Sequence, residues 1–149
     1  MSMASEELID RAWTAFEDEN YDEAEACARR ALLIEPDSVE ARLAAARSLI
    51  NKEEYEAAIP LLREATALEP DDSEARTFLG ISLFESCRFR EAIAQLRLAV
   101  DLGEDSPDAS YWFGLAVERT GDYEEADQRF RTAHEIDPEH FPLPVRISR

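Results

Sequence analysis

The chain of 149 residues is about as long as one ordinary domain, and 45% of its residues are hydrophobic. This composition provides enough apolar surface for a folded core and excludes a disordered acidic tail. Thirty-four acidic residues against sixteen basic ones give a net charge of −18, which repels phosphate backbones and anionic lipid. We therefore expect neither nucleic acid nor a membrane as a partner.

The ends of the chain and its cysteines bear on the compartment. Residues 1–10 lack the basic and apolar regions of a secretory signal, and no apolar run is long enough to span a membrane. Cys27 and Cys87 are too few for a disulfide framework and lack the spacing of a zinc site. The sequence therefore predicts a cytoplasmic protein with free thiols.

A period of 34 residues organises the chain. One aromatic column and two alanine columns recur at this spacing, and prolines close three of the four units. Composition does not explain three columns in one register. The columns are Tyr21, Tyr55, Phe89 and Tyr123; Ala24, Ala58, Ala92 and Ala126; Ala31, Ala65, Ala99 and Ala133; the prolines are Pro36, Pro70 and Pro138.

Each unit is predicted to be a pair of amphipathic helices that fold back on each other, because the link between them is only two or three residues. In the first unit, Glu7 stands where later units carry a small residue, which indicates an N-terminal edge. In the second unit, Pro60 predicts a kinked or shortened second helix. The third unit is predicted to have helices over Ser73–Ser86 and Phe89–Leu102.

In the third unit, Gly103 ends the second helix and Glu104 stands where the other units have proline. Small residues in the first helices are expected to face the first alanine column across each hairpin; these are Ala12, Ala46, Gly80 and Gly114.

After Pro138 the closely spaced prolines predict an extended tail over residues 139–149. Three interpretations of this tail stay open: it covers the last helix, it occupies a groove, or it leads into a further domain.

The fourth unit carries Phe113-Gly114, Gly121-Asp122-Tyr123, Ala126, Phe130, Ala133 and Pro138, a pattern that resembles the tetratricopeptide repeat family. The resemblance covers roughly residues 5–140. It implies an all-α, right-handed superhelix (an α-solenoid) of four helix-turn-helix units and eight helices. The single domain would span residues 1–138, with repeats over about 5–38, 39–72, 73–106 and 107–140.

In this family the first helices line the concave surface, so the resemblance implies which side chains face a partner. Trp13 and Tyr111 are the strongest candidates for contact, because aromatic residues with a polar group are common anchors at interfaces. Phe16 and Phe84 fit either the core or the surface. The predicted partner-binding residues are Ile9, Trp13, Glu17, Leu43, Arg47, Ile50, Asn51, Thr77, Ile81, Glu85, Tyr111, Leu115 and Arg119.

No arrangement of residues predicts catalysis. The two histidines, His134 and His140, lie near the C-terminus without a nucleophile beside them, and the acidic clusters fall at helix ends, where carboxylates cap helices. We expect no enzyme, no cofactor and no metal. On the convex side Arg29, Arg63, Arg97 and Arg131 repeat every 34 residues, which fits a solvated face or a second docking surface.

The leading hypothesis is a protein-interaction scaffold or adaptor. Its concave groove would bind a protein or peptide segment with apolar anchors and basic flanks. Other hypotheses are a self-assembling structural unit, for which a homodimer is compatible with the sequence, a chaperone-like holder of apolar segments, and the recognition domain of a larger protein.

Overall fold

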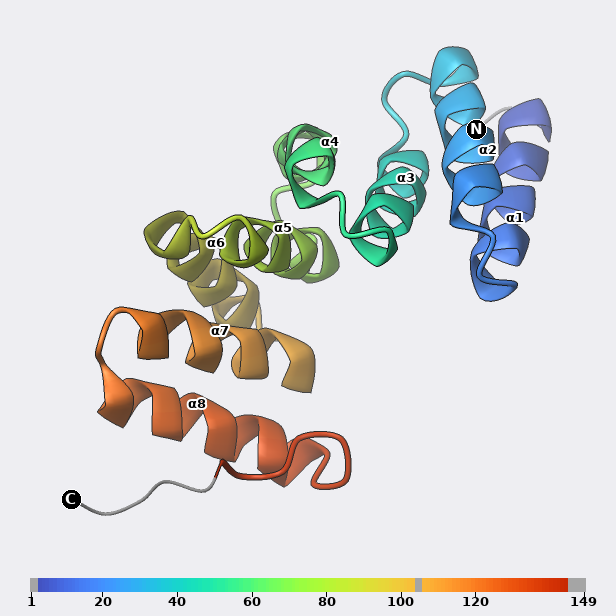
Figure 1. Ribbon diagram of the computed structural model, residues 1–149. Helices are drawn as coiled ribbons and strands as arrows, with labels where there is room; N and C mark the ends of the chain where they lie inside the picture. The colour runs from blue at the N-terminus through green and yellow to red at the C-terminus, as the bar shows by residue number, and fades with distance from the viewer. Residues whose placement is uncertain (1–2, 104–105, 145–149) are drawn as a thin grey trace.

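The computed structural model describes residues 3–103 and 106–144, and these residues form eight α-helices and no β-strand. The helices are α1 (Met3–Glu17), α2 (Tyr21–Ile34), α3 (Val39–Asn51), α4 (Tyr55–Leu68), α5 (Ser73–Glu85), α6 (Phe89–Asp101), α7 (Pro107–Arg119) and α8 (Tyr123–Ile136). They form four antiparallel pairs that stack in chain order, with α1 and α8 at opposite ends of the stack (Figure 1). The predicted all-α superhelix of four units is confirmed. Glu104 and the tail beyond residue 144 lie outside the described residues.

The contacts between helices show which row lies inside the curve. Each second helix packs on the first helix of the next unit: α2 on α3, α4 on α5 and α6 on α7. The backbones of successive first helices also approach each other along the whole stack, whereas the backbones of the second helices lie farther apart within the described residues. A stack whose elements approach along one row curves toward that row. The first helices therefore lie on the inner side of the superhelix.

Small residues let the two helices of a unit approach closely. All members of the small columns are buried, as the sequence predicts. The partners of the glycines differ from the prediction, however. A Cβ atom on Gly80 would lie 2.4 Å from Cγ of Leu96, and one on Gly114 would lie 2.7 Å from Cε1 of Phe130. The glycines thus make room for a large side chain one helical turn beyond Ala92 and Ala126, rather than for the alanines themselves.

The turn between the two helices has the same conformation in every unit. The second residue after the first helix adopts a left-handed backbone, with φ between 60° and 91°, at Glu19, Glu53, Cys87 and Gly121. The following N–H donates back to a carbonyl five residues earlier, which closes the end of the first helix. These bonds run from Asn20 to Ala15 (2.8 Å), Glu54 to Leu49 (2.8 Å), Arg88 to Leu83 (2.9 Å) and Asp122 to Val117 (3.2 Å).

Pro60 lies inside α4 and does not shorten it, so that alternative of the prediction is wrong. The helix begins at Tyr55 and has 14 residues, as many as α2 and α8. Pro60 is exposed and α4 buries Ala58, Ile59, Leu61 and Leu62 around it. The tertiary packing of this apolar face outweighs the lost N–H bond at the proline.

The described part of the tail folds back onto the last unit. The ring of Phe141 lies 5.2 Å from that of Tyr111, and Nδ1 of His134 lies within hydrogen-bonding distance of the Phe141 carbonyl oxygen (3.0 Å). Leu143 and Pro144 lie beside Phe130 on α8. Residues 139–144 are not helical, and Phe141 lies against α7 and α8. The division of the chain at residue 138 stays a prediction.

A search of the described residues for an apolar helix long enough to cross a membrane finds none.

Candidate functional site

The first helices carry the predicted partner-binding residues on what we call the first-helix face, the inner surface of α1, α3, α5 and α7. The structure divides these residues into three groups by exposure. The half-buried group is Trp13, Arg47, Ile50, Tyr111 and Leu115; the exposed group is Glu17, Asn51, Glu85 and Arg119; the buried group is Ile9, Leu43, Thr77 and Ile81. The buried group supports the face from below, and the other two groups present side chains to solvent.

Arg47 lies at the centre of the N-terminal half of this face. Its guanidinium lies 5.3 Å from the ring centroid of Trp13, 4.9 Å from that of Phe16 and 5.0 Å from that of Phe78. The same group forms an ion pair with Glu74 at 3.6 Å. A cation among three aromatic rings and one carboxylate is held by cation–π attraction and charge together. Arg47 therefore joins three units rather than facing a partner freely.

Two contacts of the same kind link successive first helices. Nε1 of Trp13 donates to Glu40 (3.3 Å), and Arg47 pairs with Glu74. In both pairs the second residue follows the first by 27 positions, since 40−13 and 74−47 are both 27. The acceptor is in each case the acidic residue in the first turn of the next first helix.

A cavity of about 440 Å³ opens on this face between α3, α5 and α7. We call it the Glu74–Asp108 pocket. Its lining combines apolar side chains with carboxylates and small polar groups. The lining residues are Arg47, Ser73, Glu74, Thr77, Phe78, Ile81, Ser106 and Asp108.

The C-terminal half of the face is a continuous aromatic cluster. Phe84, which is 8% exposed and belongs to the core, meets the edge of Trp112 at 5.5 Å between ring centroids. Trp112 contacts Tyr111, and Tyr111 contacts Phe130 on α8. Phe16, the counterpart of Phe84 in the first unit, is half-buried. Because Tyr111 contacts Trp112 and Phe130, its own chain covers part of its ring.

The sequence analysis missed two aromatic residues on this face. Phe78 lines the Glu74–Asp108 pocket and Trp112 is half-buried beside Phe84. They occupy the same place in the third and fourth units, 34 residues apart. The equivalent positions in the first two units are Asp10 and Ala44, so the column does not repeat along the chain. The one signal in the sequence was the large aromatic residue that directly follows Thr77 and Tyr111.

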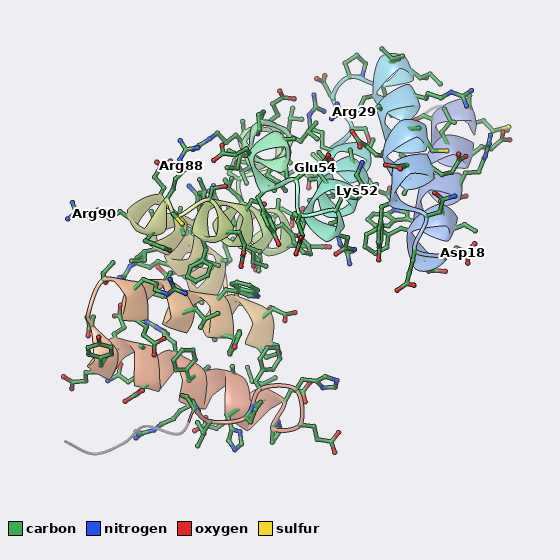
Figure 2. All side chains as sticks on the ribbon, in the orientation of Figure 1. Asp18, Arg29, Lys52, Glu54, Arg88 and Arg90 are labelled. Atoms are coloured by element: carbon green, nitrogen blue, oxygen red, sulfur yellow. The ribbon has the colours of Figure 1, made fainter. Side chains whose placement is uncertain are left out.

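Lys52 crosses the junction between the first two units on the outer side. At the end of α3 it donates to Asp22 (2.9 Å) and Glu25 (2.7 Å) on α2, and it pairs with Glu54 at 3.4 Å. Figure 2 shows Lys52 and Glu54 near each other where α3 turns into α4, with Arg29 on α2. These carboxylates raise the pKa of Lys52 above its ordinary range. Burial raises the pKa of Glu25, but the bonds from Lys52 and Arg29 outweigh it and leave that pKa lowered.

The arginine column on the second helices forms ion pairs. Arg63 reaches Glu91 at 2.8 Å and Arg97 reaches Glu125 at 3.3 Å, each on the second helix of the next unit. Arg29 instead pairs within its own helix, with Glu25, because Ala57 stands where a carboxylate would be needed. Arg63 and Arg97 therefore link successive units, and whether the column also serves as a second docking surface stays a prediction.

The described residues contain no group of three or more histidine, cysteine, aspartate or glutamate side chains that could hold a metal ion. His140 pairs with Asp137 at 2.8 Å, and this hydrogen bond lowers the pKa of that carboxyl. Cys27 is buried, and burial together with the nearby carboxylate of Glu23 raises its pKa, which disfavours a reactive thiolate. The surroundings of His140, Asp137 and Cys27 are therefore those of structural residues.

Solved structures confirm the architecture. A crystal structure of MamA protein is 23% identical in sequence to this chain and superposes with a TM-score of 0.83. The match covers 93% of this chain and 75% of the MamA chain. MamA from Desulfovibrio magneticus RS-1, from residue 41 to its end, gives 21% identity, coverage of 91% and 76%, and a TM-score of 0.81. At these identities the likeness establishes the fold alone.

The sequence itself establishes the family. No curated protein matches the chain. The tetratricopeptide repeat family matches it over residues 9–73, 43–107 and 79–140, and together these windows cover most of the chain. Such repeats build protein-interaction scaffolds, which is the general class that the match supports. The chain is a member of the tetratricopeptide repeat family.

Proposed function

We propose that this protein is a scaffold that holds an extended or helical segment of a partner protein on its first-helix face. The observation that carries the proposal is the combination of half-buried aromatic residues with an acidic column on one curved surface. Glu6, Glu40, Glu74 and Asp108 form this column at intervals of 34 residues. Aromatic side chains with a polar group, such as Trp13 and Tyr111, are common anchors at protein interfaces.

The two components select different parts of a partner. Trp13 and Leu115 offer half-buried apolar surface near the two ends of the face, where apolar anchor residues of a bound segment would gain the most from leaving water. The acidic column and the net charge of −18 attract basic residues that flank those anchors. An affinity near 1 μM, about −8 kcal/mol, is typical of such a reversible contact.

The proposal is tested by panning a phage-displayed library of random peptides against the immobilised full chain. The best enriched peptides are then titrated against the wild type and against Trp13→Ala/Tyr111→Ala. We expect the double variant to weaken binding at least tenfold. A matched control is Tyr123→Ala, which removes an exposed aromatic side chain from a second helix and should leave binding unchanged.

Two results would contradict the proposal. One is equal affinity of the double variant and the wild type, with circular dichroism showing that both are folded. The other is a library that yields no peptide above background. A salt titration examines the charge component separately, because affinity for a basic peptide should fall as ionic strength rises.

A further inference from the structure

The contacts between successive first helices follow a rule that fails at one place. Trp13 bonds Glu40 and Arg47 pairs with Glu74, and each pair spans 27 residues. The next pair in this register is Ile81 with Asp108. An isoleucine offers neither a hydrogen-bond donor nor a charge, so it cannot engage the carboxylate. Within the described residues Asp108 has no hydrogen bond or ion pair from its carboxylate.

A pocket lies beside this unengaged carboxylate. Ile81 and Asp108 both line the Glu74–Asp108 pocket of about 440 Å³, together with Thr77 and Phe78. Glu74 is already paired with Arg47, so the charges of these two largely cancel. Asp108 leaves the pocket with one net negative charge over an apolar floor.

We propose that the Glu74–Asp108 pocket takes one basic side chain, arginine or lysine, of the bound peptide, and that Asp108 selects it. This inference rests on the proposed function and assigns it a specificity-determining residue. The chain contains the precedent in Arg47, whose guanidinium lies over aromatic rings and reaches a first-turn carboxylate. In the third unit a basic residue of the partner would supply the cation that Ile81 cannot provide. The aliphatic stem of that partner residue would lie on the apolar floor of the pocket.

Asp108 also has a local role. An acidic residue in the first turn stabilises a helix through its dipole, and Asp108 has that position in α7. Glu40 and Glu74 have the same position in α3 and α5, and both also bond a side chain from the preceding unit. Asp108 is exposed, so water solvates its carboxylate in the free protein, and a cation from a partner would take the place that Trp13 and Arg47 have in the earlier units.

The charge of the chain favours a basic peptide over a second copy as the occupant. A second copy would bring its own net charge of −18 toward an acidic face, and this repulsion opposes association. A peptide with a positive residue brings the opposite charge. In the described part of the chain, the pocket contains one carboxylate without a bonded cation, so one basic position should stand out from the rest of the peptide.

The test uses peptides enriched from a random phage-displayed library on the full chain. We expect the wild type to enrich peptides with arginine or lysine at one fixed position relative to the apolar anchors. For the best peptide, Asp108→Asn should weaken the dissociation constant about tenfold, and Ile81→Arg should do the same because its own guanidinium would pair with Asp108. Replacing the fixed basic residue of the peptide by norleucine should weaken binding to the wild type equally and leave binding to Asp108→Asn unchanged.

The matched control is Asp18→Asn, which removes the same charge from an exposed carboxylate at the first hairpin. It should bind as the wild type does, and circular dichroism should show that all variants fold. If Asp108→Asn and Ile81→Arg both retain full affinity while Trp13→Ala/Tyr111→Ala loses it, the inference is overturned and the proposed function stands. If no peptide is enriched, or the double variant also retains full affinity, both fail.

Discussion

The two halves of the stack solve the same packing problem with different side chains. In the first two units the first helix carries Ala12 and Ala46, and the facing position of the second helix carries Ala28 and Leu62. In the last two units the first helix carries glycine, and Leu96 and Phe130 face it. The largest of these side chains, Phe130, faces a glycine, but leucine faces alanine in the second unit and glycine in the third. What the period preserves is a small residue on the first helix, not one fixed pair of residues.

The halves also differ on the first-helix face. The N-terminal half satisfies its own carboxylates, through Trp13 at Glu40 and Arg47 at Glu74. The C-terminal half leaves Asp108 without such a bond, and its aromatic cluster around Trp112 and Tyr111 is half-buried. The family pattern fixes the fold in all four units, yet it leaves the carboxylates of the two halves with different partners.

The largest expected effect tests the packing difference. Gly114→Ala should lower the free energy of unfolding by about 2 kcal/mol, because its Cβ would collide with the Phe130 ring at 2.7 Å. Gly80→Ala should lower it as well, because its Cβ would collide with Cγ of Leu96. Urea unfolding followed by circular dichroism measures both. A variant of either glycine that is as stable as the wild type would contradict this account of the packing.

The junction between the first two units should depend on Lys52. Lys52→Met should cost about 1 kcal/mol at neutral pH, because it leaves the half-buried Glu25 with Arg29 as its remaining charged donor. Arg90→Met is the control, since this exposed arginine on α6 forms no ion pair within the described residues. Urea titrations of the two variants should therefore separate them clearly.

This contribution should depend on pH. The pKa of Glu25 is lowered in the folded state, so its stabilising effect is complete above the ordinary value of 4.5 and is lost as the pH falls through the folded value. The stability difference between the wild type and Lys52→Met should shrink below about pH 4.5. The pKa of Lys52 is raised, so its contribution should persist until the pH exceeds 10.5. A difference that stays constant below pH 4 would argue against the assignment.

A smaller effect is expected where Arg47 joins the N-terminal units. Arg47→Met keeps the apolar stem but removes the cation from the rings of Phe16 and Phe78, and should cost about 0.5–1 kcal/mol. Arg119→Met removes an exposed cation at the other half, beside Phe84 and Phe89, and should cost less. Thermal unfolding of the pair tests whether the N-terminal half depends more on its internal cation.

The smallest effects concern the hairpin turns. Cys87 has a φ of 63°, a conformation that strains a residue with a side chain and suits glycine. Cys87→Gly should raise stability by about 0.5 kcal/mol, because relief of strain slightly exceeds the added freedom of the unfolded chain. Gly121→Ala should lower stability by a similar amount, because alanine is strained at the positive φ of this position. The loss should stay small because nothing lies within 4 Å of an added Cβ. Differential scanning calorimetry should give shifts of opposite sign.

The sequence predicted the elements that depend on local periodicity. The helix pairs, the buried alanine columns and the edge at Glu7 follow from the register of 34 residues, because each unit repeats the same pattern of burial. The turn conformation could not be predicted in the same way. Only the fourth unit has glycine at the left-handed position, where the others carry Glu19, Glu53 and Cys87.

The contacts within the candidate site also could not be predicted from the repeat pattern of the sequence. The pairing of Arg47 with Glu74 depends on the rotation between units, which no single unit encodes. Phe78 and Trp112 escaped notice because the first two units have Asp10 and Ala44 in that column. Conversely, Ile9, Leu43 and Thr77 lie more deeply than a surface assignment suggests. Exposure at these positions depends on how closely neighbouring first helices approach.

The order of helix contacts also has a mechanical consequence. Within the described residues each unit contacts only its neighbours in the stack, so the distance between Glu40 and Asp108 is set by two successive junctions. A rotation of a few degrees at each junction would add up along the stack. We therefore expect the width of the first-helix face to change more than the packing at any one junction.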